Sequence, residues 1–251
     1  MLKIGLIGDI HGNLEALEAV LEYLSTKQKV DKIVVLGDIV GYMANPNECV
    51  ELVKDYDCIQ GNHDSTVVYG EDLDWFNPVA KEALIWTINE LTDKNKNILR
   101  DFPLTKIYRE EDFTISHGTL NSPEKFLYMD RSFEARESFD LMETQLLFIG
   151  HTHVPQYFIS NGDNSFADIE MVSDIDYKRE IQLQKGKKYI FNIGSVGQPR
   201  DHNYKSCFVI YDTDRKTIKY VRLPYKVKIT ARKVKKNRLP KFLYKRILVG
   251  M

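Results

Sequence analysis

The sequence contains little cysteine and no long apolar run. Three of its 251 residues are cysteines (Cys49, Cys58 and Cys207), an odd number without the paired spacing of a thiolate metal site. Unpaired cysteines are typical of reducing compartments and argue against a disulfide-stapled secreted scaffold. No segment has the length of a membrane-spanning helix, and the apolar start of the chain is too short for a signal peptide. We therefore expect a cytoplasmic protein with no membrane partner.

The chain also lacks an overall excess of one charge, with 35 Lys and Arg against 36 Asp and Glu. Ten of the basic residues and none of the acidic ones lie in residues 226–251, which leaves residues 1–225 with 25 basic and 36 acidic side chains, a net charge of −11. An acidic body with a basic tail is not the pattern of a general nucleic-acid-binding protein. Nucleic acid stays a possible but less favoured partner. The lysines of the tail either cover a solvated face or contact phosphate-rich partners.

The first segment of the chain places a carboxylate and an imidazole at the end of a predicted strand. Residues 2–7 are an apolar run typical of a buried strand, and residues 14–24 have the spacing of an amphipathic helix. Asp9 and His11 lie between them, and side chains two residues apart in an extended segment point to the same side. They can therefore reach one point in space, although turn or capping roles would also account for them.

The same arrangement recurs at the next two predicted strands. Residues 32–36 end in glycine followed by Asp38, and residues 57–60 end in glycine followed by Asn62 and His63. Parallel strands joined by helices place their C-terminal ends side by side, where open α/β sheets have their sites. We therefore expect these side chains to lie close to one another.

Three further histidines follow later strands in the same way. The predicted strand at 113–116 precedes His117, and the strand at 145–149 precedes His151 and His153. Carboxylates gathered with these residues would repel one another and raise each other's pKa, whereas divalent cations keep them ionised and bind neutral imidazole. Oxygen and nitrogen ligands without thiolate suit Mn, Fe or Zn, of which we favour Mn.

The candidate ligands are too many for one tetrahedral ion and suit two ions that share a carboxylate. Two divalent metals about 3.5–4 Å apart are the arrangement used for in-line displacement at phosphorus.

The order of the elements indicates an α/β fold, because early strands alternate with helices whereas later strands follow one another. Residues 71–101 form a predicted helical insertion, interpreted as core packing or as a lid whose aromatic side chains touch substrate. Residues 226–251 form a predicted helical extension, with a break at 237–240.

These segments resemble, in order, the five signatures of the calcineurin-like metallophosphoesterases: GDIHGN (8–13), GD (37–38), GNHD (61–64), SHG (116–118) and GHTH (150–153). The resemblance covers nearly the whole chain, and residues 191–201 and the end of the tail look like the bacterial and archaeal branch of phosphatases and phosphodiesterases. It implies a metallophosphoesterase domain at 1–225 with the extension packed on it. The implied fold is a four-layer α/β/β/α sandwich of two mixed β-sheets flanked by helices, with a dinuclear site on the rim between the sheets.

The resemblance also implies a role for each matching residue. The implied metal ligands are Asp9, His11 and His153 for one ion, Asn62, His117 and His151 for the other, and Asp38 as the bridge. His63 matches the residue that contacts the phosphate and protonates the leaving group, a role that contributes about 10²–10⁴-fold to the rate.

The sequence departs from the eukaryotic-type protein phosphatases of this family. Gly41 stands where they carry an Asp that orients the catalytic histidine, which leaves Asp64 as a candidate partner for His63. Asn13 stands where they carry an Arg. Arg200, in a glycine-rich turn, can supply a phosphate-binding guanidinium instead or be a salt-bridged surface residue. Asn13 and Arg200 are the candidate substrate-binding residues.

The leading hypothesis is a metal-dependent phosphoesterase that hydrolyses a phosphomonoester or phosphodiester by attack of a hydroxide bridging two divalent metals. The expected substrate is a small phosphorylated compound or nucleotide. One alternative is a catalytically silent scaffold or binding protein on the same fold. Another is a nucleic-acid-directed phosphodiesterase that uses the basic tail. The sequence does not indicate an oligomeric state.

Overall fold

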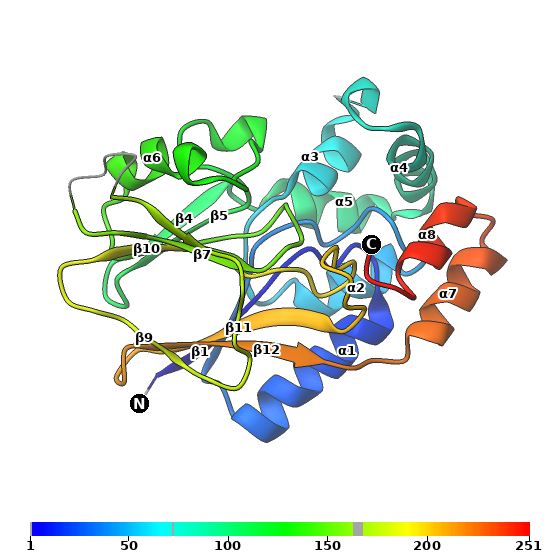
Figure 1. The fold of residues 1–251 in the computed structure, drawn as a ribbon. Coiled ribbons are helices and arrows are strands. Elements are labelled where there is room, and N and C mark those ends of the chain that lie inside the picture. Colours follow the sequence, from blue (N-terminus) through cyan, green and yellow to red (C-terminus); the bar gives the residue numbers. More distant parts are fainter. Residues whose placement is uncertain (1, 72, 163–167) are drawn as a thin grey trace.

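The computed structural model describes residues 2–71, 73–162 and 168–251, and these residues form two packed six-stranded sheets (Figure 1). The first sheet has the order β3 (Asp57–Cys58), β2 (Lys32–Val35), β1 (Lys3–Ile7), β11 (Ser206–Asp212), β12 (Thr217–Leu223) and β9 (Ile181–Gln182). The second has the order β4 (Thr105–Tyr108), β5 (Phe113–Ser116), β6 (Leu146–Ile149), β10 (Lys188–Asn192), β7 (Gln156–Ser160) and β8 (Glu170–Val172). Both sheets are mixed: β1, β2 and β3 pair in parallel, as do β5, β6 and β10, and antiparallel strands complete each sheet.

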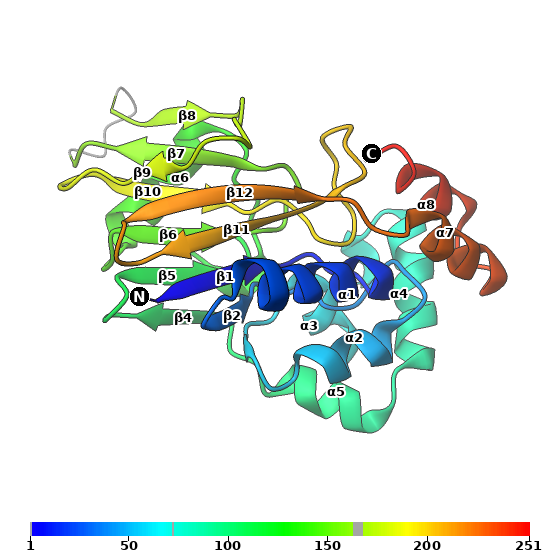
Figure 2. The same cartoon turned by 90° about the horizontal axis from the view of Figure 1, so that it is seen from below.

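Helices cover the outer face of each sheet, and this gives the expected four layers, which are seen edge-on in Figure 1. Figure 2 looks onto the layers from the side of the first sheet. The first sheet is covered by α1 (Leu14–Glu22), α2 (Pro46–Val53), α3 (Asn62–Tyr69), α4 (Pro78–Glu90) and α5 (Asp93–Arg100). The second sheet is covered by α6 (Ser132–Leu141). Short helical turns complete the body: a π-helical turn at Tyr23–Gln28 and 3-10 turns at Leu73–Trp75 and Pro123–Lys125. The predicted α/β class with two mixed sheets flanked by helices is confirmed.

The alternation of side chains along each strand allows the second sheet to be packed on both of its faces. Leu146 and Phe148 of β6 face the first sheet, whereas Leu147 and Ile149 face α6. Successive side chains of a strand point to opposite faces, so a strand buried on both sides is apolar throughout. Burying one such side chain contributes about 1.5–3 kcal/mol to stability. The sandwich therefore forms a rigid support for the loops at its edge.

The basic extension forms two helices, α7 (Val227–Lys236) and α8 (Lys241–Arg246), which lie beside α4 (Figure 1). Leu243 and Ile247 belong to one buried cluster with Tyr42 and Ala83. Lys233 of α7 pairs with Glu15 of α1, its Nζ 2.5 Å from Oε1. The extension therefore packs on the loop that leads from β2 to α2, close to the carboxyl ends of the parallel strands.

The three cysteines are buried, and none of them forms a disulfide. The described residues include no helix that is both long and apolar enough to cross a membrane.

Candidate metal centre

Five of the candidate ligands have a left-handed backbone conformation. Their φ angles are 50° at Asp9, 53° at His11, 50° at Asp38, 69° at His151 and 63° at His153. This conformation is uncommon for residues other than glycine, and each instance costs about 1–3 kcal/mol unless the surroundings impose it. Here the strand ends impose it, since these residues stand where strands leave the sheets. The sharp turns direct the side chains toward one region between the two sheets.

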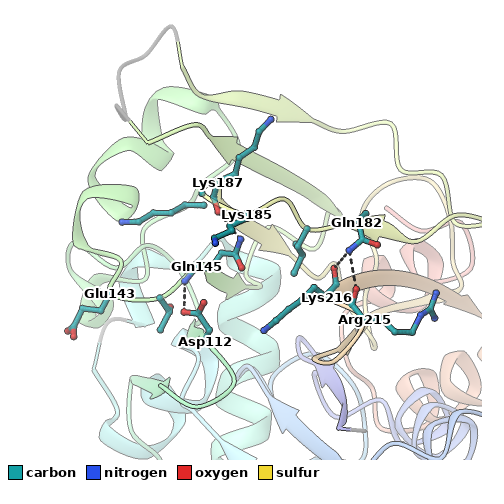
Figure 3. Close-up of a pocket in the computed structure, with 12 residues that line it drawn as sticks. Asp112, Glu143, Gln145, Gln182, Lys185, Lys187, Arg215 and Lys216 are labelled. Atoms are coloured by element: carbon teal, nitrogen blue, oxygen red, sulfur yellow. Dashed lines mark hydrogen bonds between the residues drawn. The ribbon is translucent and has the colours of Figure 1, made fainter.

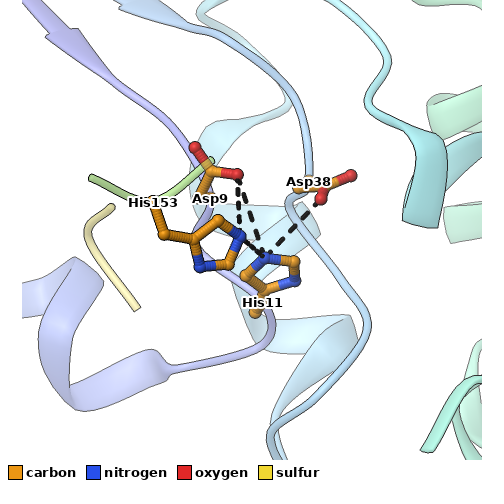
Figure 4. Close-up of side chains that lie close together, drawn as sticks. All are labelled: Asp9, His11, Asp38 and His153. Carbon is orange, nitrogen blue, oxygen red and sulfur yellow. Dashed lines mark hydrogen bonds and ion pairs between the residues drawn. The ribbon is translucent and has the colours of Figure 1, made fainter. Parts of the chain in front are cut away.

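The side chains meet in two groups that share one carboxylate. Ligand atoms of Asp9, His11, Asp38 and His153 all lie within 4.8 Å of one another (Figure 4), and those of Asp38, His117 and His151 do the same. The Nε2 atom of His153 is 3.2 Å from Asp9 Oδ1. The Nε2 atoms of His11 and His117 are 3.6 and 3.3 Å from Asp38 Oδ2. Asp38 thus lies between the two groups, where a shared ligand would stand.

Backbone carbonyls fix the ring orientation of three histidines. A carbonyl oxygen can only accept, so the ring nitrogen that faces it carries a proton, and in the neutral ring the other nitrogen offers a lone pair. The Nδ1 atoms make these contacts with Val40 O at 3.2 Å for His11, Leu36 O at 2.7 Å for His117 and Gln198 O at 2.6 Å for His153. All three Nε2 atoms therefore face the shared region as potential ligands.

Several atoms in this region need a cation. The Nε2 atoms of His11 and His153 are only 3.0 Å apart, and in the tautomers set by the carbonyls two lone pairs face each other. Among the described residues, Asn62 Oδ1 and His117 Nε2 are buried atoms with no hydrogen-bond partner. A divalent cation accepts all of these donors, with typical metal–nitrogen distances of about 2.0–2.1 Å for zinc. The residues present therefore fit the metal site expected from the sequence.

Burial and neighbouring charge determine the protonation of these groups. Asp9 and His11 are 0% exposed, and His151 is 5% exposed. Burial lowers the pKa of His11 and of His151 well below the ordinary value, so both stay neutral and able to bind a metal. Burial alone would raise the pKa of Asp38, but the neighbouring imidazoles of His117, His63 and His11 together outweigh it and hold that pKa well below its usual range.

His63 lies against the same centre and is held there by aromatic packing. Its ring centroid is 4.7 Å from that of His11, 4.5 Å from Tyr42 and 5.0 Å from Phe76. A Cβ atom at Gly41 would lie 2.3 Å from His63 Nδ1, so no side chain fits at that position. Burial lowers the pKa of His63 to about 4, which leaves it neutral at pH 7 before substrate binds.

Asp64 does not orient His63, and this expectation was wrong. The carboxylate oxygens of Asp64 accept backbone N–H groups of Val40 and Gly61, each at 3.1 Å. His63 Nδ1 is a buried atom that has no hydrogen-bond partner in the described part of the chain. Asp64 caps the start of α3, as carboxylates near a helix N-terminus commonly do, and does not serve the histidine beside it.

Asn13 has no hydrogen-bonding atom left for a substrate, contrary to the sequence expectation. Its Oδ1 accepts from Ala16 N at 3.3 Å and Thr230 Oγ1 at 3.0 Å, and its Nδ2 donates to Gly197 O at 2.8 Å and Tyr225 OH at 3.1 Å. An amide side chain has two acceptor and two donor positions, and all four are used. Asn13 is the buried N-cap of α1 and links it to the extension.

Arg200 is placed beside the centre. It is half-buried, its Nη2 donates to Tyr42 OH at 3.3 Å, and its backbone N donates to His153 O at 3.2 Å. Burial is the main cause of the low pKa of His63. The charge of Asp38 raises that pKa, and the charge of Arg200 lowers it further. The ring of Tyr128 stacks on His151 with centroids 3.9 Å apart.

Sequence reasoning did not assign these tyrosines, or Phe76, to the site. Tyr42 follows the Gly37–Gly41 segment directly, and that proximity was the available signal. Phe76 lies within the predicted insertion at 71–101. Of the aromatic residues there, Phe76 packs against His63, whereas Trp75 is 88% exposed.

A separate hollow of about 670 Å³ lies away from this centre (Figure 3). It is lined at Asp112, Gln145, Lys188 and Lys216, near the start of β5, β6, β10 and β12. The candidate ligands follow the ends of the parallel strands instead, so this hollow has no part in the metal centre.

Fold and site together define a metal-dependent phosphoesterase, a hydrolase of phosphoester bonds. The chain belongs to the calcineurin-like phosphoesterase superfamily, whose domain matches residues 2–216.

Among its relatives is the uncharacterized protein MJ0912 of Methanocaldococcus jannaschii, 38% identical over 251 residues and covering 98% of each chain. The metallophosphoesterase of Sphaerobacter thermophilus is similar in structure, with a TM-score of 0.86 and 35% identity, covering 100% of this chain and 99% of that one. The hypothetical protein PH1004 of Pyrococcus horikoshii OT3 has a TM-score of 0.80 at 19% identity, covering 100% and 99% of the two chains, and shares the fold.

Proposed function

We propose that this protein hydrolyses a phosphomonoester or phosphodiester with two divalent metal ions, manganese being favoured. The single observation that supports this most strongly is the pair of ligand groups joined at Asp38. When bound, such a pair lowers the pKa of water and neutralises charge on the phosphate. Asp9, His11 and His153 would hold one ion, Asn62, His117 and His151 the other, with Asp38 between them.

His63 is the proposed proton donor to the leaving group. Its ring lies against His11, and its backbone N donates to Asp38 Oδ1 at 2.9 Å. These two contacts hold His63 in place beside the proposed metal ligands. In the free protein it is neutral, and an arriving phosphate dianion would raise its pKa because the negative charge favours the imidazolium. Arg200 is the proposed substrate-binding residue, since its guanidinium stands beside this ring system and suits an oxyanion.

The proposal is tested by hydrolysis of a panel of aryl monoesters, aryl diesters and nucleotides in the presence of added Mn²⁺. Wild-type protein should turn over one of these classes, and a chelator should abolish the activity. Asp38→Asn should lose at least about 10²-fold in kcat, because it removes a charge from the position between both groups. Absence of turnover on every class by the metal-loaded protein would favour a binding protein on this fold instead.

A further inference from the structure

Two guanidinium groups from distant parts of the sequence lie on one side of the centre. Arg200 follows β10, and Arg246 ends α8; both are half-buried. Arg200 Nη2 contacts Tyr42 OH at 3.3 Å, and the Tyr42 ring is 4.6 Å from that of His11. Ile247, the residue after Arg246, packs in the same buried cluster as Tyr42. Tyr42 therefore connects both arginine-bearing segments with the metal centre.

The end of the chain ties these segments together. The backbone N of His202, two residues after Arg200, donates to Gly250 O at 2.7 Å. Arg246 Nε donates to Met251 O. A Cβ atom at Gly250 would lie 2.5 Å from the Asn203 backbone, so only glycine allows this close approach. The two arginine-bearing segments are thus held together by the backbone contact of His202 with Gly250, and Arg246 itself donates to a backbone oxygen through its guanidinium.

No side-chain carboxylate of the described residues pairs with either guanidinium. In residues 2–71, 73–162 and 168–251, no Asp or Glu forms an ion pair with Arg200 or Arg246, and Asp201 beside Arg200 pairs with Arg222 instead. Arg200 contacts the Gln198 amide oxygen and Tyr42, and the terminal nitrogens of Arg246 have no hydrogen bond in the same ranges. Burial, and then the charge of Arg200, lowers the pKa of Arg246 to about 10. Two half-buried like charges repel each other, and an anion bound between them would relieve that repulsion.

We propose that Arg200 and Arg246 form an anion subsite beside the metal centre, and that the substrate is a phosphate ester whose leaving group carries a second anionic group. This inference rests on the proposed function. Planar guanidinium groups bind phosphate or carboxylate through paired hydrogen bonds, so either group satisfies the subsite. The basic extension then acts in substrate selection through one residue, and its exposed lysines do not take part.

The experiment compares three esters that differ only beyond the scissile bond: phenyl phosphate, 4-carboxyphenyl phosphate and 1,4-phenylene bisphosphate. For each, kcat/KM is measured on Mn²⁺-loaded wild type, Arg246→Gln, Arg246→Lys and the control Lys245→Gln, which changes an exposed charge on the same helix. Wild type should prefer one or both of the esters that carry the second anionic group. Arg246→Gln should reduce that preference about tenfold or more, the loss typical of a charge-assisted hydrogen bond. Arg246→Lys should keep part of the preference. Lys245→Gln should keep all of it.

Binding of pyrophosphate and of phosphate to the metal-free protein, measured by calorimetry, tests the subsite without turnover. Wild type should bind pyrophosphate more tightly, and Arg246→Gln should lose about tenfold in that preference. If the loaded protein hydrolyses no ester, the proposed function fails, and this binding result still decides the subsite. Equal preference in wild type and Arg246→Gln, or an equal loss in Lys245→Gln, would overturn the inference. Thermal melts identify a misfolded Arg246→Gln variant; in that case Arg246→Lys, which keeps the charge but not the planar fork, should show a weaker preference than wild type, and an unchanged preference would overturn the inference.

Discussion

A methyl group at Gly41 should displace the proposed proton donor, His63, and press more weakly on His11, whose Nδ1 would lie 3.1 Å from the added Cβ. The added Cβ would lie 2.3 Å from His63 Nδ1, whereas ordinary contact begins at 3.4 Å, so the ring must move by about 1 Å. The backbone there has φ +135°, which costs an L-residue about 1–3 kcal/mol, and overpacking adds about 1–3 kcal/mol. We expect Gly41→Ala to lower the free energy of unfolding by about 2–6 kcal/mol in total.

Activity should fall further than stability explains. A displacement of about 1 Å at a reacting group costs roughly 10²-fold in rate, so kcat on the preferred ester should drop by that factor in protein that is still folded. The matched control is Gly70→Ala, since Gly70 also has a positive φ, 71°, but nothing lies within 4 Å of the added atom. Gly70→Ala should lose only about 1 kcal/mol and keep wild-type kcat. A folded Gly41→Ala protein with kcat within threefold of wild type would refute the placement of His63.

Three further changes test neighbouring parts of the account. His63→Ala should lower kcat by about 10²–10⁴-fold while the bound metal, measured by atomic emission, is unchanged, and a loss of metal would make it a ligand instead. Asn13→Ala removes a helix cap and leaves its buried hydrogen-bond partners unsatisfied, so urea titration should show a free energy of unfolding lower by about 2–4 kcal/mol. A raised KM at unchanged stability would support the substrate-binding role instead. Despite burial, the charge of Asp38 raises the pKa of His117 from 6.5 to about 9 in the metal-free protein. That imidazolium stabilises the metal-free fold fully below pH 6.5 and progressively less as pH rises through about 9. At pH 7 metal binding must displace its proton, so calorimetry in buffers of different ionisation enthalpy should show proton release, and metal affinity should rise with pH; binding without release would contradict this.

Much of the fold could be predicted because its elements have strong periodicity. The apolar run at residues 2–7 became β1 (Lys3–Ile7), and the leucine spacing after it became α1 (Leu14–Glu22). The break expected at 237–240 separates α7 from α8, since Pro240 cannot continue a helix. Patterns of this kind depend on local sequence alone.

Other features depend on contacts between distant residues and leave no local pattern. The segment after Gly61 was interpreted as the end of a strand, but helix α3 (Asn62–Tyr69) begins there, because Asp64 caps it from within. Strand β4 (Thr105–Tyr108) was not predicted, since it is short and gains its hydrogen bonds only beside β5.

The site shows the same division. Ligand types at strand ends were readable from spacing, because parallel strands must bring those ends together. The burial of Asn13 depends on Thr230, 217 residues away, and the packing of Tyr42 depends on the extension at Ile247. No spacing rule predicts such contacts, so the spacing indicated which side chains gather at the strand ends and did not indicate the residues packed around them.

The central claim is that this group of side chains holds two divalent cations. Equilibrium dialysis against Mn²⁺, with the bound metal counted by atomic emission, tests it directly on wild type and Asp38→Asn. The account predicts two ions per wild-type chain and at least one fewer, or much weaker binding, in the variant. A wild-type chain that binds no metal, or an Asp38→Asn chain that binds as wild type does, would contradict it.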